Sequence, residues 1–301
     1  MANQSNGPLL VTGASGHLGR RVVELLLSGP RGPSEARKII ALTRTPDKLA
    51  EFAARGVEVR MGDFDRPDAL QAAFRGAERI LIISTDSLDR PGRRLEQHLG
   101  AVKAAKAAGA SHLVYTSLTH PGPDSPITLA PDHWATEQAI REAFHSYTVL
   151  RNNLYTDHLL MGLSRALSAG KLANAFGKGA VGYVTREDCA QAAAGALASR
   201  FDGNAVLDIT GPAVVSQAEL AALCSELSGK PLQYLAIDAQ TATKNALAAG
   251  FPAPIAELLI SFEVAGNLGQ LAVASSAVLE LSGRAPSSVR DFLTTNRAAL
   301  G

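Results

Sequence analysis

The chain has only two cysteines and seven histidines among its 301 residues, and their spacing excludes the common metal and disulfide frameworks. Cys189 and Cys224 stand far apart, so the sequence predicts neither a disulfide scaffold nor a cysteine-based metal site. No two histidines have the HExxH or HxxxH spacing of a helical zinc site. We therefore expect no metal.

Long apolar runs and an excess of one charge are also lacking. No stretch approaches the ~20 apolar residues that span a membrane, and the polar start MANQSNGP lacks the core of a signal peptide. With 29 basic and 28 acidic residues the formal net charge is +1, which gives no reason to expect nucleic acid as a partner. The sequence predicts a cytoplasmic protein that binds neither membranes nor nucleic acid.

Apolar residues make up 46% of the chain, enough for a sizeable core. Strand-like and helix-like segments alternate through the first half at the interval of a doubly wound parallel sheet. Expected strands are residues 8–12, 38–43, 57–61, 79–84, 112–117 and 147–151, and expected helices are 18–27, 48–55, 67–74, 93–108 and 134–144. The predicted fold class is therefore α/β, with a Rossmann-type sheet.

Beyond Arg151 the pattern changes to Gly- and Ala-rich helices with short strand candidates at residues 182–185, 205–209 and 232–237. We expect residues 1–151 to form a nucleotide-binding domain, with a segment of about 182–209 returning to it. Residues 152–301 would form a smaller, mostly helical lobe over the carboxyl edge of the sheet, where open α/β sheets bind ligands. The stretch PRGPS, residues 30–34, predicts an exposed loop.

The strongest local signal is VTGASGHLG, residues 11–19, in which three glycines separate an apolar strand from a helix. Gly13 would allow a tight turn, Gly16 the approach of a pyrophosphate, and Gly19 close packing of a helix whose N-terminus faces the phosphates. The alternative is an ordinary glycine-rich βα turn. The motif predicts a dinucleotide in contact with Thr12, Gly13, Ser15, Gly16, His17, Leu18 and Gly19.

The end of the second strand favours NADPH over NADH. An NAD-preferring site usually has Asp or Glu here to bind the ribose 2′-hydroxyl, but this chain has Arg44, with Lys48 one helical turn further on. Both suit a 2′-phosphate. The alternative is a solvated arginine at the start of a loop.

Polar residues after the third and fourth strands are further cofactor candidates. Asp63 would accept a hydrogen bond from the adenine amino group, with Phe64 against the ring; alternatively, Asp63 or Asp65 caps the next helix. Ser84 and Thr85 would contact the cofactor through backbone and hydroxyl groups, the alternative being a plain transition from strand to loop.

Several motifs, in order, resemble those of the NmrA-like atypical short-chain dehydrogenases. They are TGASGHLG, the pair Thr43-Arg44, GDFDRPDAL, ILIIS, HLVYTSLTH, HWATEQAI and LRNNLYTDHLL. The resemblance covers nearly the whole chain, weakening after about Asp238, and is strongest to the branch that reduces quinones and triphenylmethane dyes. It implies an NADPH-dependent reductase without flavin.

The resemblance also bears on the catalytic groups. Ordinary short-chain dehydrogenases donate a proton through Ser and a Tyr-xxx-Lys pair. This chain keeps Thr116 and Ser117 but has His133 and Glu137 in place of the Tyr and Lys, as in the quinone and dye reductase branch. Alcohol dehydrogenation is therefore not expected, whereas hydride transfer to an electrophilic acceptor is. Thr116 is a candidate cofactor contact, and Ser117, His133 and Glu137 are catalytic candidates.

His133 and Glu137 lie one helical turn apart, so they are expected to share a face and form a hydrogen-bonded pair at the mouth of the nicotinamide site. There His133 would orient the acceptor or supply a proton near neutral pH. The alternative is a pair that braces the proline-rich loop at residues 121–131.

The sequence RNNLY after the sixth strand supplies candidate contacts for the acceptor. Asn152 and Asn153 would bind an oxygen of a quinone, and Tyr155 would stack on its ring. Asparagine at a strand end is also a common turn former. Phe176 and the region 251–262 would close the pocket, or else pack within the lobe.

Two functions fit these expectations. One is an NADPH-dependent reductase that passes hydride directly to a small aromatic acceptor, such as a quinone or a triarylmethane or azo dye. The other is a redox sensor that binds NADP(H) without significant turnover, as some NmrA-like proteins do. We favour the enzyme because the motifs after the fifth and sixth strands resemble those of the reductases. A homodimer is compatible with both functions.

Overall fold

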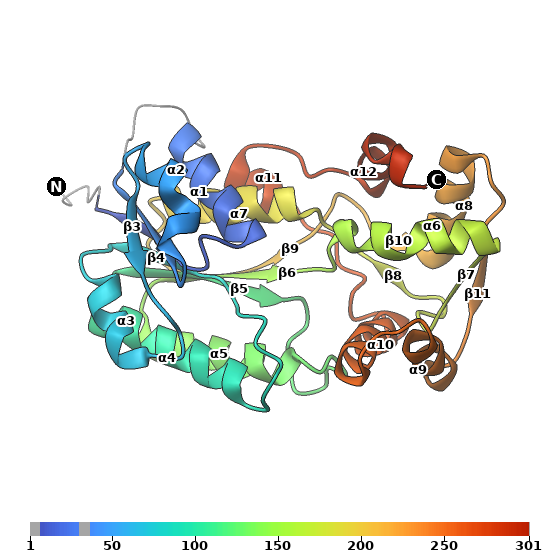
Figure 1. The fold of residues 1–301 in the computed structure, drawn as a ribbon, viewed down its shortest axis with the longest axis horizontal. Helices are drawn as coiled ribbons and strands as arrows, with labels where there is room; N and C mark the ends of the chain where they lie inside the picture. Colours follow the sequence, from blue (N-terminus) through green and yellow to red (C-terminus); the bar gives the residue numbers. More distant parts are fainter. Residues whose placement is uncertain (1–6, 30–36, 301) are drawn as a thin grey trace.

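A seven-stranded parallel sheet organises the first part of the molecule (Figure 1). The computed structural model describes residues 7–29 and 37–300. The strands are β1 (Leu9–Val11), β2 (Ile39–Thr43), β3 (Glu58–Met61), β4 (Arg79–Ile82), β5 (His112–Leu118), β6 (Tyr147–Asn152) and β9 (Asn204–Ile209), in the order β3-β2-β1-β4-β5-β6-β9. The order reverses between β1 and β4, which is where open sheets bind ligands.

Helices cover both faces of this sheet (Figure 1). One layer contains α1 (His17–Ser28), α7 (Arg186–Ala198) and α11 (Ala277–Ser282), and the other contains α3 (Pro67–Phe74), α4 (Arg93–Ala107) and α5 (Ala130–Ala143). Successive strand residues point to opposite faces, so Leu9 and Val11 pack toward α1 while Leu10 packs toward α3 and α4. The short helices η1 (Pro46–Leu49) and α2 (Ala50–Ala53) follow β2.

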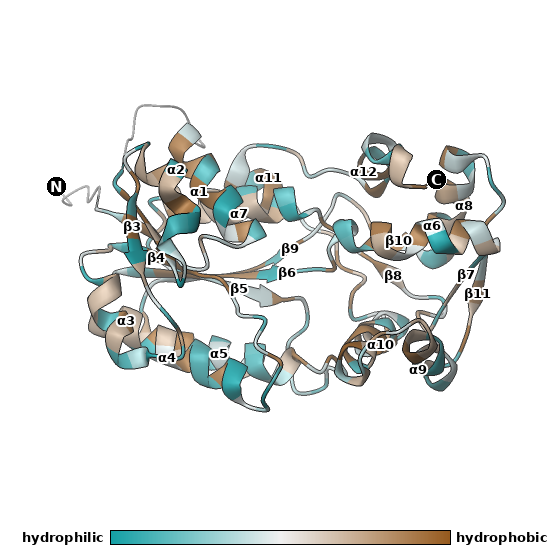
Figure 2. Ribbon diagram, viewed as in Figure 1, coloured by the Kyte–Doolittle hydropathy of each residue, from teal (hydrophilic) through white to brown (hydrophobic). Residues whose placement is uncertain are grey.

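A lobe with its own apolar core lies beyond the carboxyl edge of the sheet (Figure 1). After η2 (Thr156–Leu159), it contains α6 (Leu160–Ala169), α8 (Gln217–Ser228), α9 (Ala239–Ala248), α10 (Ala253–Asn267), α12 (Val289–Thr295) and η3 (Arg297–Leu300). Two small sheets join β7 (Lys171–Asn174) to β11 (Gln233–Ala236) and β8 (Ala180–Val181) to β10 (Val215–Ser216). Hydrophobic colours mark much of α10 in Figure 2, in keeping with the run APIAELLISF that makes up its first two thirds.

The predicted Rossmann-type α/β fold is confirmed, and the six strands expected in the first half all form. Two expectations were wrong. Residues 182–185 make only a single bridge, Tyr155 to Val184, because the backbone N–H groups of Gly182 and Val184 bind Leu271 and Leu154 instead of a neighbouring strand. The helix expected from residue 134 begins at Ala130, since Pro131 lies in its first turn, where proline is favoured. The expected loop at 30–34 lies outside the described residues.

Two later segments return to the sheet. Helix α7 packs beside α1, and β9 pairs in parallel with β6. Arg79, at the start of β4, joins the sheet to the end of α7: its guanidinium donates to the carbonyl oxygens of Leu197 at 3.0 Å and Ala196 at 3.2 Å. These carbonyls belong to the last turn of the helix, which has no intrahelical donors for them. The division into domains at residue 151 stays a prediction.

His112 lies at the amino end of β5 and is buried and neutral. Its Nδ1 lies 2.6 Å from the Ser146 hydroxyl and its Nε2 lies 3.0 Å from the Thr148 hydroxyl. Burial, assisted by the charge of Arg79, lowers its pKa from 6.5 to about 3. The unfolded chain therefore takes up a proton at this residue before the folded chain does. The stability that it contributes is present above pH 6.5 and is lost as the pH falls toward 3.

We expect the destabilisation caused by His112→Gln to shrink as the pH falls. Between pH 6.5 and about 5, the difference in unfolding free energy between wild type and variant should decrease by about 1.4 kcal/mol per pH unit, since glutamine does not titrate. Urea unfolding of both proteins across this range measures the difference, in which the other titrating groups cancel. A penalty independent of pH would contradict the assignment.

Candidate active site

The glycine turn between β1 and α1 has an open outer surface. Gly13 has a φ of +59°, which favours glycine, and a Cβ on Gly19 would overlap the carbonyl group of Gly13. Gly13, Gly16 and His17 are exposed. No side chain caps α1, so N–H groups of its first turn remain for a ligand. The turn therefore offers a backbone surface and a helix N-terminus to an anion.

The turn is bonded to the end of β2. The Thr43 hydroxyl donates to Ser15 Oγ at 2.8 Å and accepts from the N–H of Thr45 at 3.1 Å. Arg44 directly follows the last residue of β2. Arg44 and Lys48 are exposed, and within the described part of the chain neither side chain has a hydrogen bond or an ion pair. Two unpaired cations thus lie beyond the strand that supports the turn.

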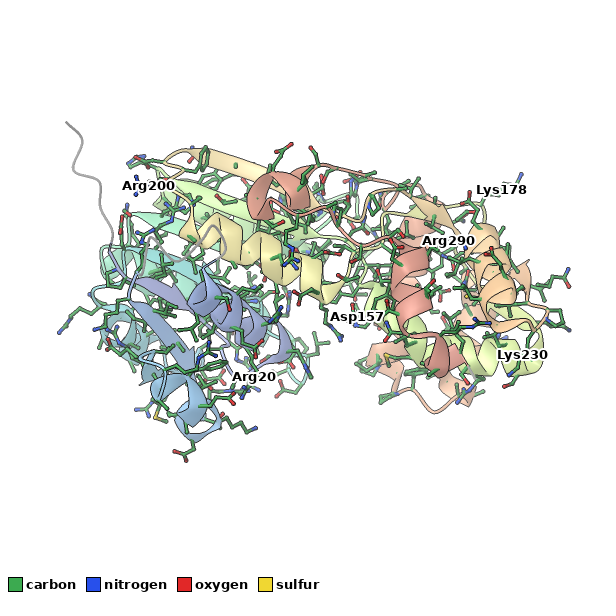
Figure 3. All side chains as sticks on the ribbon, turned by 90° about the horizontal axis from the view of Figure 1, so that it is seen from above. Arg20, Asp157, Lys178, Arg200, Lys230 and Arg290 are labelled. Atoms are coloured by element: carbon green, nitrogen blue, oxygen red, sulfur yellow. The ribbon has the colours of Figure 1, made fainter. Side chains whose placement is uncertain are left out.

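The backbone of Lys48 is held by α1. Arg20 donates from Nη2 to the Lys48 carbonyl oxygen at 2.9 Å and also pairs with Glu51, while its guanidinium lies over the ring of Phe52. Figure 3 shows Arg20 on the outer side of this part of the molecule.

Two buried threonines, predicted as cofactor contacts, hold the chain after β4. The Thr12 hydroxyl accepts from the N–H of Ile83 at 3.0 Å, and the Thr116 hydroxyl accepts from the N–H of Ser84 at 2.9 Å. Ile83, Ser84 and Thr85 are half-exposed, whereas both threonines are buried. The threonine side chains therefore position residues 83–85 and are not themselves on the surface.

Neither alternative cap forms at the start of α3. Asp63 accepts from the N–H of Asp65 in a local turn at 3.1 Å, and Asp65 pairs with Arg93 and Gln97 of α4. The hydrogen bond from Arg93, and to a lesser extent the one from Gln97, lowers the pKa of Asp65 to about 2. Phe64 packs partly against the core below β2. Contact of Asp63 and Phe64 with adenine stays a prediction.

Ser117 and Glu137 meet between β5 and α5. Glu137 is completely buried, and the Ser117 hydroxyl donates to its Oε1 at 2.7 Å. Arg151 of β6 donates to both oxygens of Glu137, from Nε at 3.0 Å and from Nη2 at 2.7 Å. The hydroxyl hydrogen of Ser117 is therefore already used. Arg151 was not among the predicted site residues, although the RNNLY motif contains it.

His133 binds partners other than Glu137, so the predicted pair is wrong. Its Nε2 lies 2.7 Å from Arg94 Nη2, and its Nδ1 lies 2.8 Å from the Tyr115 hydroxyl. The residue is 3% exposed. His133 and Glu137 do share one face of α5, but that face packs against β5 and α4 and does not open to a substrate. Glu137 is bound by donors on β5 and β6, whereas His133 is bound by groups on α4 and β5. The two side chains therefore do not pair with each other.

His98 of α4 continues this buried network. Its Nδ1 lies 3.3 Å from the Tyr115 hydroxyl and 3.2 Å from the Thr136 hydroxyl, and its Nε2 accepts from the N–H of Thr85 at 3.0 Å. Arg94 donates from Nε to the Thr85 carbonyl oxygen at 2.7 Å. The sequence analysis missed both residues. Their signal was present, because Arg94 and His98 continue the stripe of buried positions formed by Ala101 and Ala105.

Partners that can only donate determine where both histidines carry their protons. The N–H of Thr85 donates to His98 Nε2, and the Arg94 guanidinium donates to His133 Nε2. Each ring therefore has its proton on Nδ1, directed toward Tyr115 and its neighbours. Burial, assisted by the charge of Arg94, lowers the pKa of His98 to about 3, and burial lowers the pKa of His133 far below its usual value. Both rings are neutral at pH 7.

We expect nitrogen-15 NMR spectra to show His98 and His133 with a protonated Nδ1 and an unprotonated Nε2, because a second proton would face Thr85 N–H or Arg94. This pattern should persist from about pH 8 to about 5. The signals lost in His98→Asn and in His133→Asn assign the two rings. Titration of either ring within this range, or a proton on Nε2, would disprove the arrangement.

The predicted acceptor contacts have different surroundings. Asn153 uses both ends of its amide internally, donating to the Leu271 carbonyl at 3.0 Å and accepting from Leu154 N–H at 2.8 Å, which agrees with the alternative of a turn former. Asn152 donates to the Tyr155 hydroxyl at 3.2 Å, and its buried Oδ1 has no partner in the described chain. Phe176 is buried in the core of the lobe.

The chain just beyond these residues lies where the sheet meets the lobe. Asp157, labelled near the centre of Figure 3, accepts from the N–H of Arg186 at the start of α7. A hollow of about 430 Å³ lies elsewhere, between α9, α10 and the segment before α5, and is lined by Pro126, Leu247 and Ile260 among others. None of the four predicted acceptor contacts, Asn152, Asn153, Tyr155 and Phe176, lines this hollow.

Within the ranges 7–29 and 37–300, no cluster of His, Cys, Asp or Glu could hold a metal ion, and Cys189 and Cys224 are buried free thiols. No helix in the same ranges is both long and apolar enough to cross a bilayer.

Comparison with known proteins decides the family. The model of the NmrA-like family matches residues 5–293. This chain belongs to the NmrA-like family. Quinone oxidoreductase 2 of Escherichia coli (strain K12) is 32% identical to this NmrA-like protein over 286 residues, which cover 95% of this chain and 97% of the relative. The NAD(P)H azoreductase of Xenophilus azovorans is 28% identical over 294 residues, with coverage of 97% and 99%.

Two solved structures of reductases are similar to this chain over nearly its whole length. The E. coli NADPH-dependent quinone oxidoreductase in complex with NADPH has a TM-score of 0.88 and 31% identity, covering 96% of this chain and 99% of that chain. The Citrobacter sp. triphenylmethane reductase in complex with NADP(H) has a TM-score of 0.86 and 35% identity, with the same coverage. The resemblance carried by the motifs is confirmed, and this NmrA-like protein is an oxidoreductase.

Proposed function

We propose that this protein is an NADPH-dependent reductase that passes hydride, without a flavin, to an electrophilic aromatic acceptor: a quinone, or a triarylmethane or azo dye. The observation that carries the proposal is an open dinucleotide-type turn beside two unpaired cations, combined with buried polar groups that leave no proton free for a carbonyl substrate. The reductase relatives named above support the same conclusion.

The residues present fit NADPH. The exposed turn at Gly13 and Gly16 and the uncapped start of α1 would receive the pyrophosphate. Arg44 and Lys48 would bind the 2′-phosphate, since neither forms an ion pair within the described residues. Ser84 and Thr85 would border the nicotinamide at the reversal of strand order. When bound, NADPH would supply the hydride.

The class of acceptor follows from which side chains near the site have a proton to donate. The Ser117 hydroxyl donates to Glu137, and His133 is enclosed and neutral, so neither offers a proton as hydride arrives. A cationic triarylmethane dye becomes neutral on gaining hydride and needs no proton. A quinone gains hydride to give a hydroquinone anion, which takes its proton from water. These acceptors suit a site without a general acid.

We propose that Ser117, Glu137 and His133 serve this reaction by holding β5, β6 and α5 in place. The acceptor would lie beyond the ends of β5 and β6. There the unpartnered Oδ1 of Asn152 would accept a hydrogen bond from the hydroxyl of the reduced quinone, since the quinone itself has no donor, and the half-buried ring of Tyr155 would flank the bound molecule.

Replacing Arg44 should discriminate the two nicotinamide cofactors. Arg44→Ala is expected to weaken the binding of NADPH by about 1.5 to 3 kcal/mol, the range for a hydrogen bond to a charged group, and to leave the binding of NADH unchanged. Arg55→Ala, at another exposed arginine beyond α2, is the matched control. Fluorescence titration of both cofactors measures the effect. Equal losses for NADPH and NADH would refute the assignment.

A panel of acceptors tests the reaction itself. The purified protein should oxidise NADPH in the presence of menadione, benzoquinone, a triarylmethane dye or an azo dye, followed by loss of nicotinamide absorbance. It should do so without a copurifying flavin, because the nicotinamide itself would occupy the place beside Ser84. Rates no faster than the blank with all four acceptors would favour the redox sensor. Activity on a secondary alcohol alone would contradict both functions.

A further inference from the structure

We propose that Arg94 and His98 are positioning residues that hold the peptide of Thr85 against the nicotinamide half of the cofactor. The inference rests on the proposed function for the place of the nicotinamide. It assigns a role to two buried side chains that do not themselves reach the exposed turn.

Residues 83–85 are held by one side chain at each successive N–H. The hydroxyls of Thr12 and Thr116 accept from the N–H groups of Ile83 and Ser84, in place of the backbone carbonyls of a neighbouring strand. At Thr85 the support is different, because both polar groups of its backbone are bound. His98 accepts from its N–H and Arg94 donates to its C=O, both from the first half of α4. The two groups therefore fix the orientation of the Thr85 backbone, in addition to its position.

The supporting side chains are themselves fixed. Arg94, which is 4% exposed, also donates to His133 and to the Asp132 carboxylate at 3.3 Å, and His133 in turn binds the Tyr115 hydroxyl. His98 is held on its other side by Thr136, whose hydroxyl donates to the Asp132 carbonyl at 2.6 Å. Because the Thr85 N–H and the Arg94 guanidinium can only donate, both histidines accept at Nε2 and carry their proton on Nδ1.

Apolar packing of α4 on the sheet does not require this cluster. The same stripe of α4 continues with Ala101, Val102 and Ala105, which pack on the sheet without polar groups. Burying a guanidinium and two imidazoles costs free energy that apolar side chains at these positions would not cost. The cluster lies where the stripe reaches the half-exposed chain after β4, beside the reversal of strand order. Its location matches a function in orienting that chain.

The test separates the nicotinamide half of the site from the adenosine half. His98→Asn withdraws the acceptor from the Thr85 N–H, whereas His98→Gln keeps an oxygen near the place of Nε2. Hydride transfer is measured by single-turnover mixing of NADPH-loaded protein with menadione. Binding is measured for NADPH and for 2′,5′-ADP, which lacks the nicotinamide. His112→Asn and His112→Gln make the same changes at a buried histidine at the opposite end of β5.

We expect His98→Asn and Arg94→Met to slow hydride transfer by about 10- to 100-fold, the effect of a small misplacement of a reacting group. NADPH should bind several-fold more weakly, whereas the affinity for 2′,5′-ADP should be unchanged. His98→Gln should recover the greater part of the rate, and the His112 variants should leave it unaltered.

An unchanged rate in His98→Asn, equal losses for NADPH and 2′,5′-ADP, or slowing of the same size in His112→Asn would each overturn the proposal. If the wild type reduces none of the four acceptors, the proposed function fails on its own. The comparison of NADPH with 2′,5′-ADP then still decides the role of His98.

Discussion

Polar side chains are buried where the apolar core between the sheet and α4 and α5 ends, and each of them needs a partner. A polar group left without a partner there would destabilise the fold by more than the net free energy of one hydrogen bond, because water cannot replace the partner. The consequence is two closed sets of hydrogen bonds on the same side of β5. One joins Ser117, Glu137 and Arg151, and the other joins Tyr115 and His133 to α4. Together they determine how β5, β6, α4 and α5 meet at the carboxyl edge.

These sets make the edge rigid where a cofactor would lie. Thr12 and Thr116 bind the chain that leaves β4, and the first half of α4 binds the peptide that follows. Because the bonds run between side chains and backbone, the surface shape is set by residues that are themselves covered. The groups available to a ligand are then mainly backbone at the turn, backbone after β4, and the exposed cations beyond β2.

The histidines illustrate how burial changes the chemistry of a residue type. A histidine usually titrates near neutral pH, which makes it a natural candidate for proton transfer. His98, His112 and His133 are all buried, and burial lowers the pKa of each. Neutral imidazole offers one donor and one acceptor in fixed directions, which is what a bridge between two polar groups requires. In this fold the three rings act as such bridges.

Local patterns in the sequence were sufficient for the sheet and the turn. The strand LLV and the ILI segment of β4 are buried on both faces, so they appear as unbroken apolar runs. Gly13 is required by its positive φ and Gly19 by a close backbone contact, and a short motif determines both. The partners of His133 and Glu137 were not predictable in this way. Spacing placed both on one face of a helix, but which residues faced them depended on α4, β5 and β6, which are distant in sequence. Periodicity determines the direction of a side chain, and only the packing of elements far apart in the chain decides what it meets.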